Sequence, residues 1–216
     1  MIQVPIVEKD PVIDEHGRVL ADNLYGEQND DSARRDFTIN ALYYDPTTGD
    51  VLDYHDGVKD LRARRLRMIG DPADRYREDP VRMRRAARFA AKLDFTLHPD
   101  TEAPLHRLAY MLDSVPPARL FDETAKLMLA GSGAASFDWL IKLGLLPHLM
   151  PDVAAAVAGS PDAPGAKLLR LGLENTDQRV RADKSVTPTF LFAVLLWPAI
   201  LRATGATNGP LPEDPQ

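Results

Sequence analysis

The apolar residues recur at helical spacing from Pro80 to about residue 204, and this pattern constrains the fold most. Short segments rich in proline or glycine interrupt the helical pattern, namely "HPD", "SVPP", "AGSG", "GLLPHLMPD" and "GSPDAPG". These breaks predict roughly five or six helices. The ending, "TGATNGPLPEDPQ", is polar and predicts a disordered tail over residues 205–216.

Before Gly70 the pattern favours short strands. "FTINALYY" and "GDVLDYHD" flank the turn "DPTTG", which predicts a hairpin between Ala41 and Tyr54. "VKDLRAR" reads as one or two helical turns and "RLRMIG" as a strand, and "YGEQNDDSARRD" reads as a loop that leads to a helix start at Ser32. We therefore expect an α+β chain that is mainly α, with an α/β edge over residues 1–70 and a helical domain over residues 71–204.

Composition places the 216-residue chain among soluble globular proteins, with 44% hydrophobic and 27% charged residues. It has no cysteine, which excludes disulfides, thiolate metal ligands and thiol nucleophiles. "MIQVPIVEKDP" does not resemble a signal peptide, and the apolar stretch from Phe190 to Leu201 is too short to span a membrane. We expect a cytoplasmic protein without a membrane partner.

Charge is distributed unevenly along the chain. Between Lys59 and Lys92 there are 12 Lys or Arg and 5 Asp or Glu, a local charge of +7, whereas the rest carries −13 and the net charge is −6. A basic segment in an acidic protein predicts a localised site for an anion. A solvated helix face with many salt bridges is the alternative interpretation.

Asp79 and Pro80 mark a helix start, because aspartate caps free backbone N–H groups and proline suits the first helical position. A helical projection places Arg82 on the buried stripe, and puts a separate cationic face elsewhere on the helix. The predicted buried stripe consists of Met83, Ala86, Phe89, Ala90 and Leu93, and the predicted cationic face of Arg84, Arg85, Arg88 and Lys92.

An arginine on a buried stripe must be paired or must meet a ligand. Pairing of Asp79 with Arg82 three residues on would satisfy both without any function. Alternatively, both point into a cleft and read a nucleobase, since aspartate accepts and arginine donates hydrogen bonds. Arg85 and Arg88, farther along the helix, would then suit phosphates.

A second charged cluster comprises Arg34, Arg35 and Asp36, and an acidic helix cap with surface arginines explains it equally well. The five histidines show no metal-binding spacing. The chain has no glycine-rich phosphate loop of the P-loop or dinucleotide type.

Four motifs in one order resemble the class II nucleotidyltransferases, the family of bacterial poly(A) polymerases and CCA-adding enzymes. These motifs are R-R-D-F-T-x-N-A, D-G-x-x-D-L, I-G-D-P and E-D-P-x-R-x-x-R. "SVPPARLFDETAKLMLAG", "NTDQRVRAD" and "TPTFLFAVLLW" resemble the poly(A) polymerase branch, since CCA-adding enzymes usually carry an S-x-E-R-like sequence at the first of these segments. The resemblance covers about Asp22 to Ile200.

The resemblance implies a role for each matched residue. Arg35 would contact the phosphates or sugar of the nucleotide, and Asp36 would belong with the catalytic carboxylates. Asp79 and Arg82 would select the base, with Arg85 and Arg88 beside the triphosphate. Arg84 departs from the apolar residue usual at its position, and its place opposite the predicted stripe makes us expect an exposed, harmless side chain.

The metal site of the family is not matched. Its chemistry, attack of an RNA 3′-hydroxyl on the α-phosphate of ATP, needs a Gly-Gly loop and an Asp-x-Asp pair that hold two Mg²⁺ ions. This sequence contains neither, so we assign no metal ligand. The family's long basic C-terminal extension is not matched either. We expect a fragment, or a shortened relative, that begins after the metal-binding sheet.

We therefore predict the nucleotide-selecting and neck portion of a template-independent RNA 3′-end adenylyltransferase, inactive alone, with ATP as substrate, Mg²⁺ as implied cofactor and an RNA 3′ end as partner. Residues 1–70 would be the remnant of the head domain and residues 71–204 the helical neck and body. A CCA-adding enzyme and a non-catalytic RNA- or nucleotide-binding module remain as alternatives.

Overall fold

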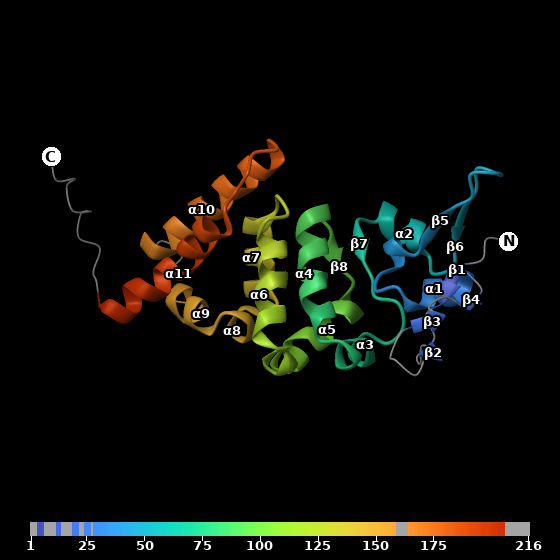
Figure 1. Ribbon diagram of the computed structural model, residues 1–216, viewed down its shortest axis with the longest axis horizontal. Coiled ribbons are helices and arrows are strands. Elements are labelled where there is room, and N and C mark those ends of the chain that lie inside the picture. Colours follow the sequence, from blue (N-terminus) through green and yellow to red (C-terminus); the bar gives the residue numbers. More distant parts are fainter. Residues whose placement is uncertain are drawn as a thin grey trace. The chain divides into compact units, whose positions relative to one another are not determined.

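The computed structural model describes four short strands within the first 26 residues, residues 28–158 and residues 164–205. Its contacts divide the chain into two compact units (Figure 1). The first unit comprises Met1–Pro72 and Thr96–Thr101, and the second Ala73–Phe95 and Glu102–Gln216. The tail predicted over 205–216 lies outside the described residues from 206 onward.

In its described residues, the first unit contains four two-stranded sheets, two short helices and a 3₁₀ turn. Three strand pairs are antiparallel, and β7 and β8 are parallel. Its elements are β1 (Val4–Ile6) with β4 (Leu24–Gly26), β2 (Val12–Ile13) with β3 (Val19–Ala21), β5 (Leu42–Tyr44) with β6 (Val51–Asp53), β7 (Arg65–Leu66) with β8 (Thr96–Leu97), α1 (Gln28–Arg34), η1 (Thr38–Asn40) and α2 (Gly57–Arg62).

The predicted hairpin is confirmed, because β5 and β6 pair with Leu42 opposite Asp53 and Tyr44 opposite Val51. The predicted helix start at Ser32 is wrong, since α1 begins at Gln28 and Ser32 lies in its interior. Gln28 and Ser32 are the buried residues of this helix. Because the buried face of α1 is polar, the sequence has no apolar periodicity there from which the helix could be predicted.

The strand predicted to end at Gly70 is short, and β7 covers only Arg65–Leu66. The following residues pair instead with the segment that contains Asp36. The Thr38 amide donates to the carbonyl of Arg67 at 3.0 Å and the Ile69 amide to that of Asp36 at 3.0 Å, around an isolated bridge between Phe37 and Met68. The R-R-D-F-T and R-L-R-M-I-G segments are therefore fixed to each other.

The second unit is helical. Eight α-helices follow Pro80 in the described part of the chain, more than the five or six predicted, because the Pro-rich segment taken as a break itself forms α8 and because a further break separates α10 from α11. The elements are α3 (Pro72–Glu78), α4 (Val81–Leu93), α5 (Pro99–Leu108), η2 (Ala109–Ser114), α6 (Pro117–Met128), α7 (Gly133–Lys142), α8 (Leu146–Leu149), α9 (Pro151–Val157), α10 (Pro164–Arg181) and α11 (Pro188–Thr204).

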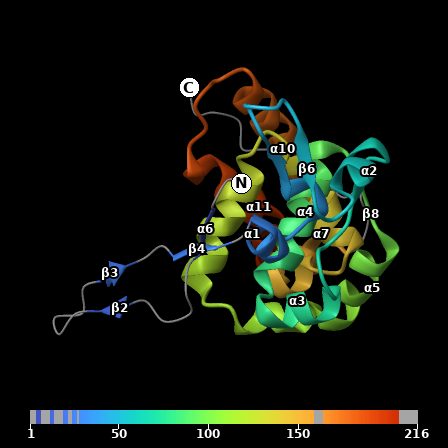
Figure 2. The same cartoon turned by 90° about the vertical axis from the view of Figure 1, so that its right-hand side faces the viewer.

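The core of this unit forms where α4 packs on α7 and α10 packs on α11 (Figures 1 and 2). The turn before α7 is held by α10, because the buried carboxylate of Asp177 accepts from the amides of Gly133 at 2.6 Å and Ala134 at 3.0 Å. Arg181 donates to the carbonyl of Gly131 at 2.7 Å. Within the described residues, no helix has both the length and the apolarity needed to cross a membrane.

Gly172 sets the close approach of α10 and α11. A Cβ atom at this position would lie 2.4 Å from Cγ1 of Val194, and a valine in a helix has little rotamer freedom to move away. We expect Gly172→Ala to lower the free energy of unfolding by about 1–2 kcal/mol, because overpacking outweighs the gain in helix propensity. Thermal unfolding measures this loss.

The matched test of the steric cause is the same substitution in a Val194→Ala background. There the clashing methyl groups are absent, so Gly172→Ala should be neutral or stabilising. An equal loss in both backgrounds would show that the helix contact is not the cause.

Candidate functional site

The predicted cap at the start of α4 is confirmed. The Asp79 carboxylate accepts from the amide of Val81 at 3.2 Å, and the Asp79 carbonyl accepts from the amide of Arg82 at 3.0 Å. Pro80 stands directly before the helix, at φ −58°. Asp79 is half-buried, so its carboxylate binds the helix end and still reaches the surface.

Arg82 is held at the corner between α3 and α4. Its Nη1 donates to the carbonyl of Arg75 at 2.9 Å and to Oε2 of Glu78 at 3.0 Å, and its side chain is only 15% exposed. Glu78 also accepts from Arg75 at 3.2 Å. Sequence reasoning gave Glu78 no role, although the E-D-P-x-R motif contains it, and the structure shows that it orients Arg82.

The prediction that Arg84 is exposed is wrong. Its side chain is 3% exposed, and its Nη2 lies 2.7 Å from Oε2 of Glu123 on α6. The buried face of α4 is rotated from the predicted stripe toward Ala87 and Arg84, while Leu93 is 36% exposed. Met83 is buried on α4 together with Ala86, Ala87 and Ala90, and α4 packs against α7.

The predicted cationic face of α4 is therefore divided. Arg85 and Lys92 are exposed, Arg88 is half-buried and Arg84 is buried. Burial of Glu123 opposes its ionisation, but Arg84, Lys126 and Arg88 outweigh this and hold the pKa of Glu123 below its usual value. The contribution of this carboxylate to stability is present above its unfolded-state pKa and is lost as pH falls through the lowered one.

Several cations of the basic segment are paired. The ion pairs of the segment include Arg67 with Asp60, Arg75 with Glu78, Arg77 with Asp74, Arg82 with Glu78, and Arg84 with Glu123. The salt-bridge interpretation thus accounts for part of the segment. The exposed side chain of Arg85 and the half-buried one of Arg88 lie on the same helix and suit an anionic ligand.

Arg35 lies in the first unit, at the end of α1. Its side chain is 48% exposed, and its Nη2 lies 2.7 Å from Oδ2 of Asp31, which also accepts from the hydroxyl of Tyr43 at 2.6 Å. Burial opposes the ionisation of Asp31, but the hydrogen bonds from Tyr43 and Arg35 outweigh it and lower the pKa. This bond network orients the Arg35 guanidinium toward Asp31.

Asp36 is buried, and Asp60 of the D-G-x-x-D-L motif bonds to residues of the two segments that pair beside it. The buried carboxylate of Asp60 accepts from the hydroxyl of Thr38 at 2.9 Å and from Nε of Arg67 at 3.0 Å. Asp60 therefore joins the segment of Thr38 to the segment of Arg67, which pair with each other beside Asp36. Sequence reasoning recognised the motif and missed this role, because the partners are 22 and 7 residues away in sequence.

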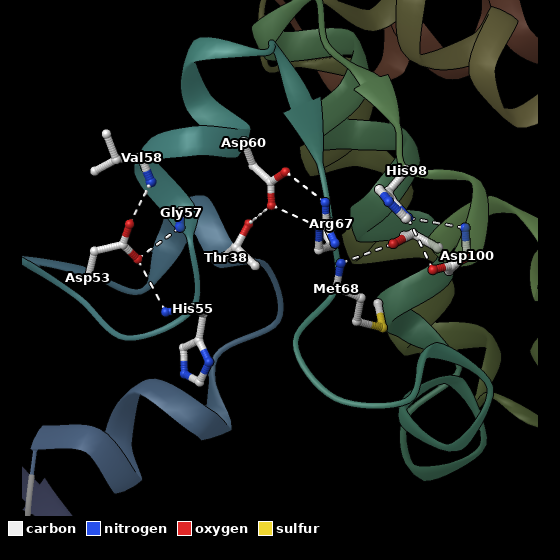
Figure 3. A network of polar contacts seen from close by, with 11 residues as sticks. Thr38, Asp53, His55, Gly57, Val58, Asp60, Arg67, Met68, His98 and Asp100 are labelled. Atoms are coloured by element: carbon white, nitrogen blue, oxygen red, sulfur yellow. Dashed lines mark hydrogen bonds and ion pairs between the residues drawn. The ribbon is translucent and has the colours of Figure 1, made fainter.

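The same motif requires a glycine. A Cβ on Gly57 would lie 2.3 Å from the carbonyl oxygen of Thr38. The carboxylate of Asp53 accepts from the amides of Gly57 at 2.8 Å and Val58 at 2.9 Å, and thereby caps α2 (Figure 3). Burial opposes ionisation of Asp53, but these backbone donors outweigh it and lower its pKa.

A polar groove lies in the first unit beside this network, lined among others by Thr38, His55, Arg67 and Gly70. The Ser32 hydroxyl donates to the carbonyl of Asn29 at 2.6 Å, so it must accept from Nε2 of His55 at 2.9 Å. A serine whose proton is committed to a carbonyl is not activated by that histidine. Ser32 and His55 therefore do not form a nucleophilic serine–histidine pair.

The predicted site residues fall in both units. Arg35 and Asp36 lie in the first, and Asp79, Arg82, Arg85 and Arg88 follow one another along α4 in the second. In the part of the chain that the structure describes, no group of three or more His, Cys, Asp or Glu could hold a metal ion. The described carboxylates thus do not fit the two Mg²⁺ ions that the family resemblance implies, and Asp36 alone cannot hold both.

Solved structures with a similar fold include a tRNA-processing enzyme and a CCA-adding enzyme. A tRNA-processing enzyme in its apo form matches with a TM-score of 0.61 at 23% identity, over 85% of this chain and 54% of that one. The CCA-adding enzyme of Bacillus stearothermophilus in complex with CTP matches with a TM-score of 0.52 at 20% identity, over 87% and 67%. The predicted α+β, mainly helical class is confirmed, and the fold is nucleotidyltransferase-like.

Two family models match successive parts of the sequence. "Poly A polymerase head domain" covers residues 8–67, and "Probable RNA and SrmB- binding site of polymerase A" covers residues 94–157. Poly(A) polymerase I of Haemophilus influenzae is 46% identical over 84% of this chain and 40% of its own length. The Escherichia coli poly(A) polymerase I is 44% identical over 87% and 40%.

The CCA-adding enzyme of Limosilactobacillus fermentum is 46% identical over only 46% of this chain and 25% of its own length. The chain belongs to the nucleotidyltransferase family of poly(A) polymerases and CCA-adding enzymes, and poly(A) polymerases match most of it. It spans about 40% of the length of the curated poly(A) polymerases.

Proposed function

We propose that the chain forms the nucleotide-selecting part of a poly(A) polymerase, which adds adenylate to an RNA 3′ end. The observation that carries this proposal is the corner between α3 and α4. There Glu78 and the Arg75 carbonyl hold Arg82, while Asp79 caps the helix, all within the E-D-P-x-R motif. Membership of the family indicates the class of reaction, and Asp79 and Arg82 at the corner are the residues that would hydrogen-bond to the base.

Each residue has a proposed role. Asp79 accepts and Arg82 donates hydrogen bonds at the base edge of the nucleotide, and a side chain already fixed in place loses little entropy on binding. Arg85 and Arg88 bind phosphates. In the first unit, Arg35 contacts the phosphates or sugar, and Asp36 is the acidic residue of the catalytic machinery. Residues 1–70 serve as part of the head, and residues 71–204 as neck and body.

The proposed ligands are ATP and an RNA 3′ end. Mg²⁺ would neutralise charge at the reacting phosphate and activate the RNA 3′-hydroxyl as nucleophile, but the described residues do not form its site, so the proposal routes no step through it. Binding of ATP and its selection over other nucleotides are the tasks assigned to these residues.

Equilibrium binding of ATP, CTP and GTP to the purified chain tests the proposal. A poly(A) polymerase part should prefer ATP by about tenfold or more, because each base hydrogen bond contributes about 1–3 kcal/mol in a closed pocket. Equal binding of ATP and CTP with rejection of GTP would favour a CCA-adding enzyme. Binding of RNA without any nucleotide preference would favour the non-catalytic binding module.

A further inference from the structure

Glu123 on α6 forms ion pairs with more than one cationic side chain. Oε2 of Glu123 lies 2.7 Å from Nη2 of Arg84, and Oε1 lies 3.3 Å from Nζ of Lys126. Both oxygens of Glu123 are thus engaged. Arg84 is nearly fully buried, whereas Glu123 keeps 29% of its side chain exposed. Arg84 is the arginine at a position where the family resemblance leads us to expect an apolar residue.

Arg88 follows Arg84 by four residues on α4, so the two side chains lie on neighbouring turns of one face. Arg88 is close enough to Glu123 to help lower the pKa of that carboxylate. Nevertheless, its Nε atom is buried and has no hydrogen-bond partner among the described residues. A buried guanidinium N–H that makes no hydrogen bond within the described residues can donate to an acceptor on a bound ligand.

We propose that Arg84 is a positioning residue that occupies Glu123 and thereby keeps Arg88 available for a phosphate group of the nucleotide. The inference rests on the proposed function of Arg88 as a phosphate-binding residue. The family resemblance assigns no role to Arg84 and does not include competition between Arg84 and Arg88 for Glu123.

The physical reason is that Glu123 would otherwise be the strongest acceptor near Arg88. Charge-assisted hydrogen bonds between arginine and a carboxylate are strong and geometrically specific. With an apolar residue at position 84, Oε2 of Glu123 becomes open to Arg88. An arginine already paired with a carboxylate binds a phosphate less well, because the pair must first be broken.

A ligand-free measurement tests the positioning step. The side-chain Nε–H resonance of Arg88 is followed by NMR in the native chain, in Arg84→Leu and in Arg84→Leu with Glu123→Gln. We expect it to shift and to exchange more slowly with water only in Arg84→Leu, where Arg88 pairs with Glu123. An Arg88 resonance that is the same in all three proteins would overturn the proposal.

Titration with inorganic triphosphate, followed by calorimetry, tests the consequence. Arg84→Leu should weaken binding about fivefold or more, and the added Glu123→Gln should restore it, because the competing carboxylate is gone. A merely structural role of Arg84 would leave the double variant as weak as the single one, which would contradict the proposal. Glu123→Gln alone should bind triphosphate at least as well as the native chain, and weaker binding would also contradict it.

The phosphate-binding role of Arg88 and the positioning role of Arg84 are tested by different measurements. If the native chain does not bind triphosphate, the proposed function of Arg88 is wrong, while the NMR comparison still decides whether Arg84 keeps Arg88 from Glu123. Thermal unfolding of each variant checks the fold. If Arg84→Leu does not fold, Arg84→Met, which retains a longer side chain, replaces it in both measurements.

Discussion

Arg82→Ala is expected to lower the affinity of the chain for ATP by about ten- to a hundredfold. The substitution removes a forked donor that Glu78 and the Arg75 carbonyl hold in place, and such a donor contributes about 1–3 kcal/mol to recognition in a closed pocket. Stability should fall little, because Glu78 is 57% exposed and remains solvated when its partner is removed. Calorimetric titration with ATP measures the affinity.

Arg77→Ala is the matched control. Arg77 is also an arginine of the basic segment, and it pairs with Asp74 at 2.7 Å, but both side chains are exposed. Its loss should leave ATP affinity within about twofold, as expected of a surface ion pair. Equal losses of affinity in the two variants would mean that the charge of the segment, and not the held geometry of Arg82, binds the nucleotide.

Gly57→Ala is expected to unfold the structure around Asp36. A Cβ atom 2.3 Å from the Thr38 carbonyl oxygen meets backbone, which cannot rotate away as a side chain can. To relieve this clash, α2 must move away from Thr38, which also strains the bonds of Asp60 to Thr38 and Arg67. We therefore expect a loss of at least about 3 kcal/mol in the free energy of unfolding. Denaturant unfolding and amide exchange at Thr38 measure this loss.

Lys59→Ala provides the control in the same helix, because Lys59 is exposed and its loss should change stability by less than about 0.5 kcal/mol. A Gly57→Ala chain as stable as this control would show that the close approach to Thr38 is not required.

Local signals in the sequence predicted the elements that local chemistry determines. The turn "DPTTG" gave the β5–β6 hairpin, and Asp79 with Pro80 gave the start of α4, because turn and cap residues act within a few positions. The start of α1 was missed because its buried face consists of Gln28 and Ser32. Burial of polar residues cannot be recognised from an apolar pattern.

The exposure of Arg84 could not be predicted from the projection of one helix. Its partner Glu123 lies 39 residues away on α6, and only the folded chain brings the two side chains together. The role of Asp60 likewise depends on Thr38 and Arg67, which only the folded chain brings together. For the candidate site, the residues named from the sequence remain a prediction, and the structure added Glu78 and the Arg75 carbonyl as the groups that hold Arg82.

The central claim is that Asp79 reads the base in addition to capping α4. Serine caps a helix about as well as aspartate, so Asp79→Ser separates the two roles. The decisive measurement is the ratio of ATP to GTP affinity for the native chain and for Asp79→Ser, with thermal unfolding as a check on the fold. We predict an unchanged fold and a loss of most of the preference for ATP. A serine variant that folds normally and prefers ATP as strongly as the native chain would contradict the claim.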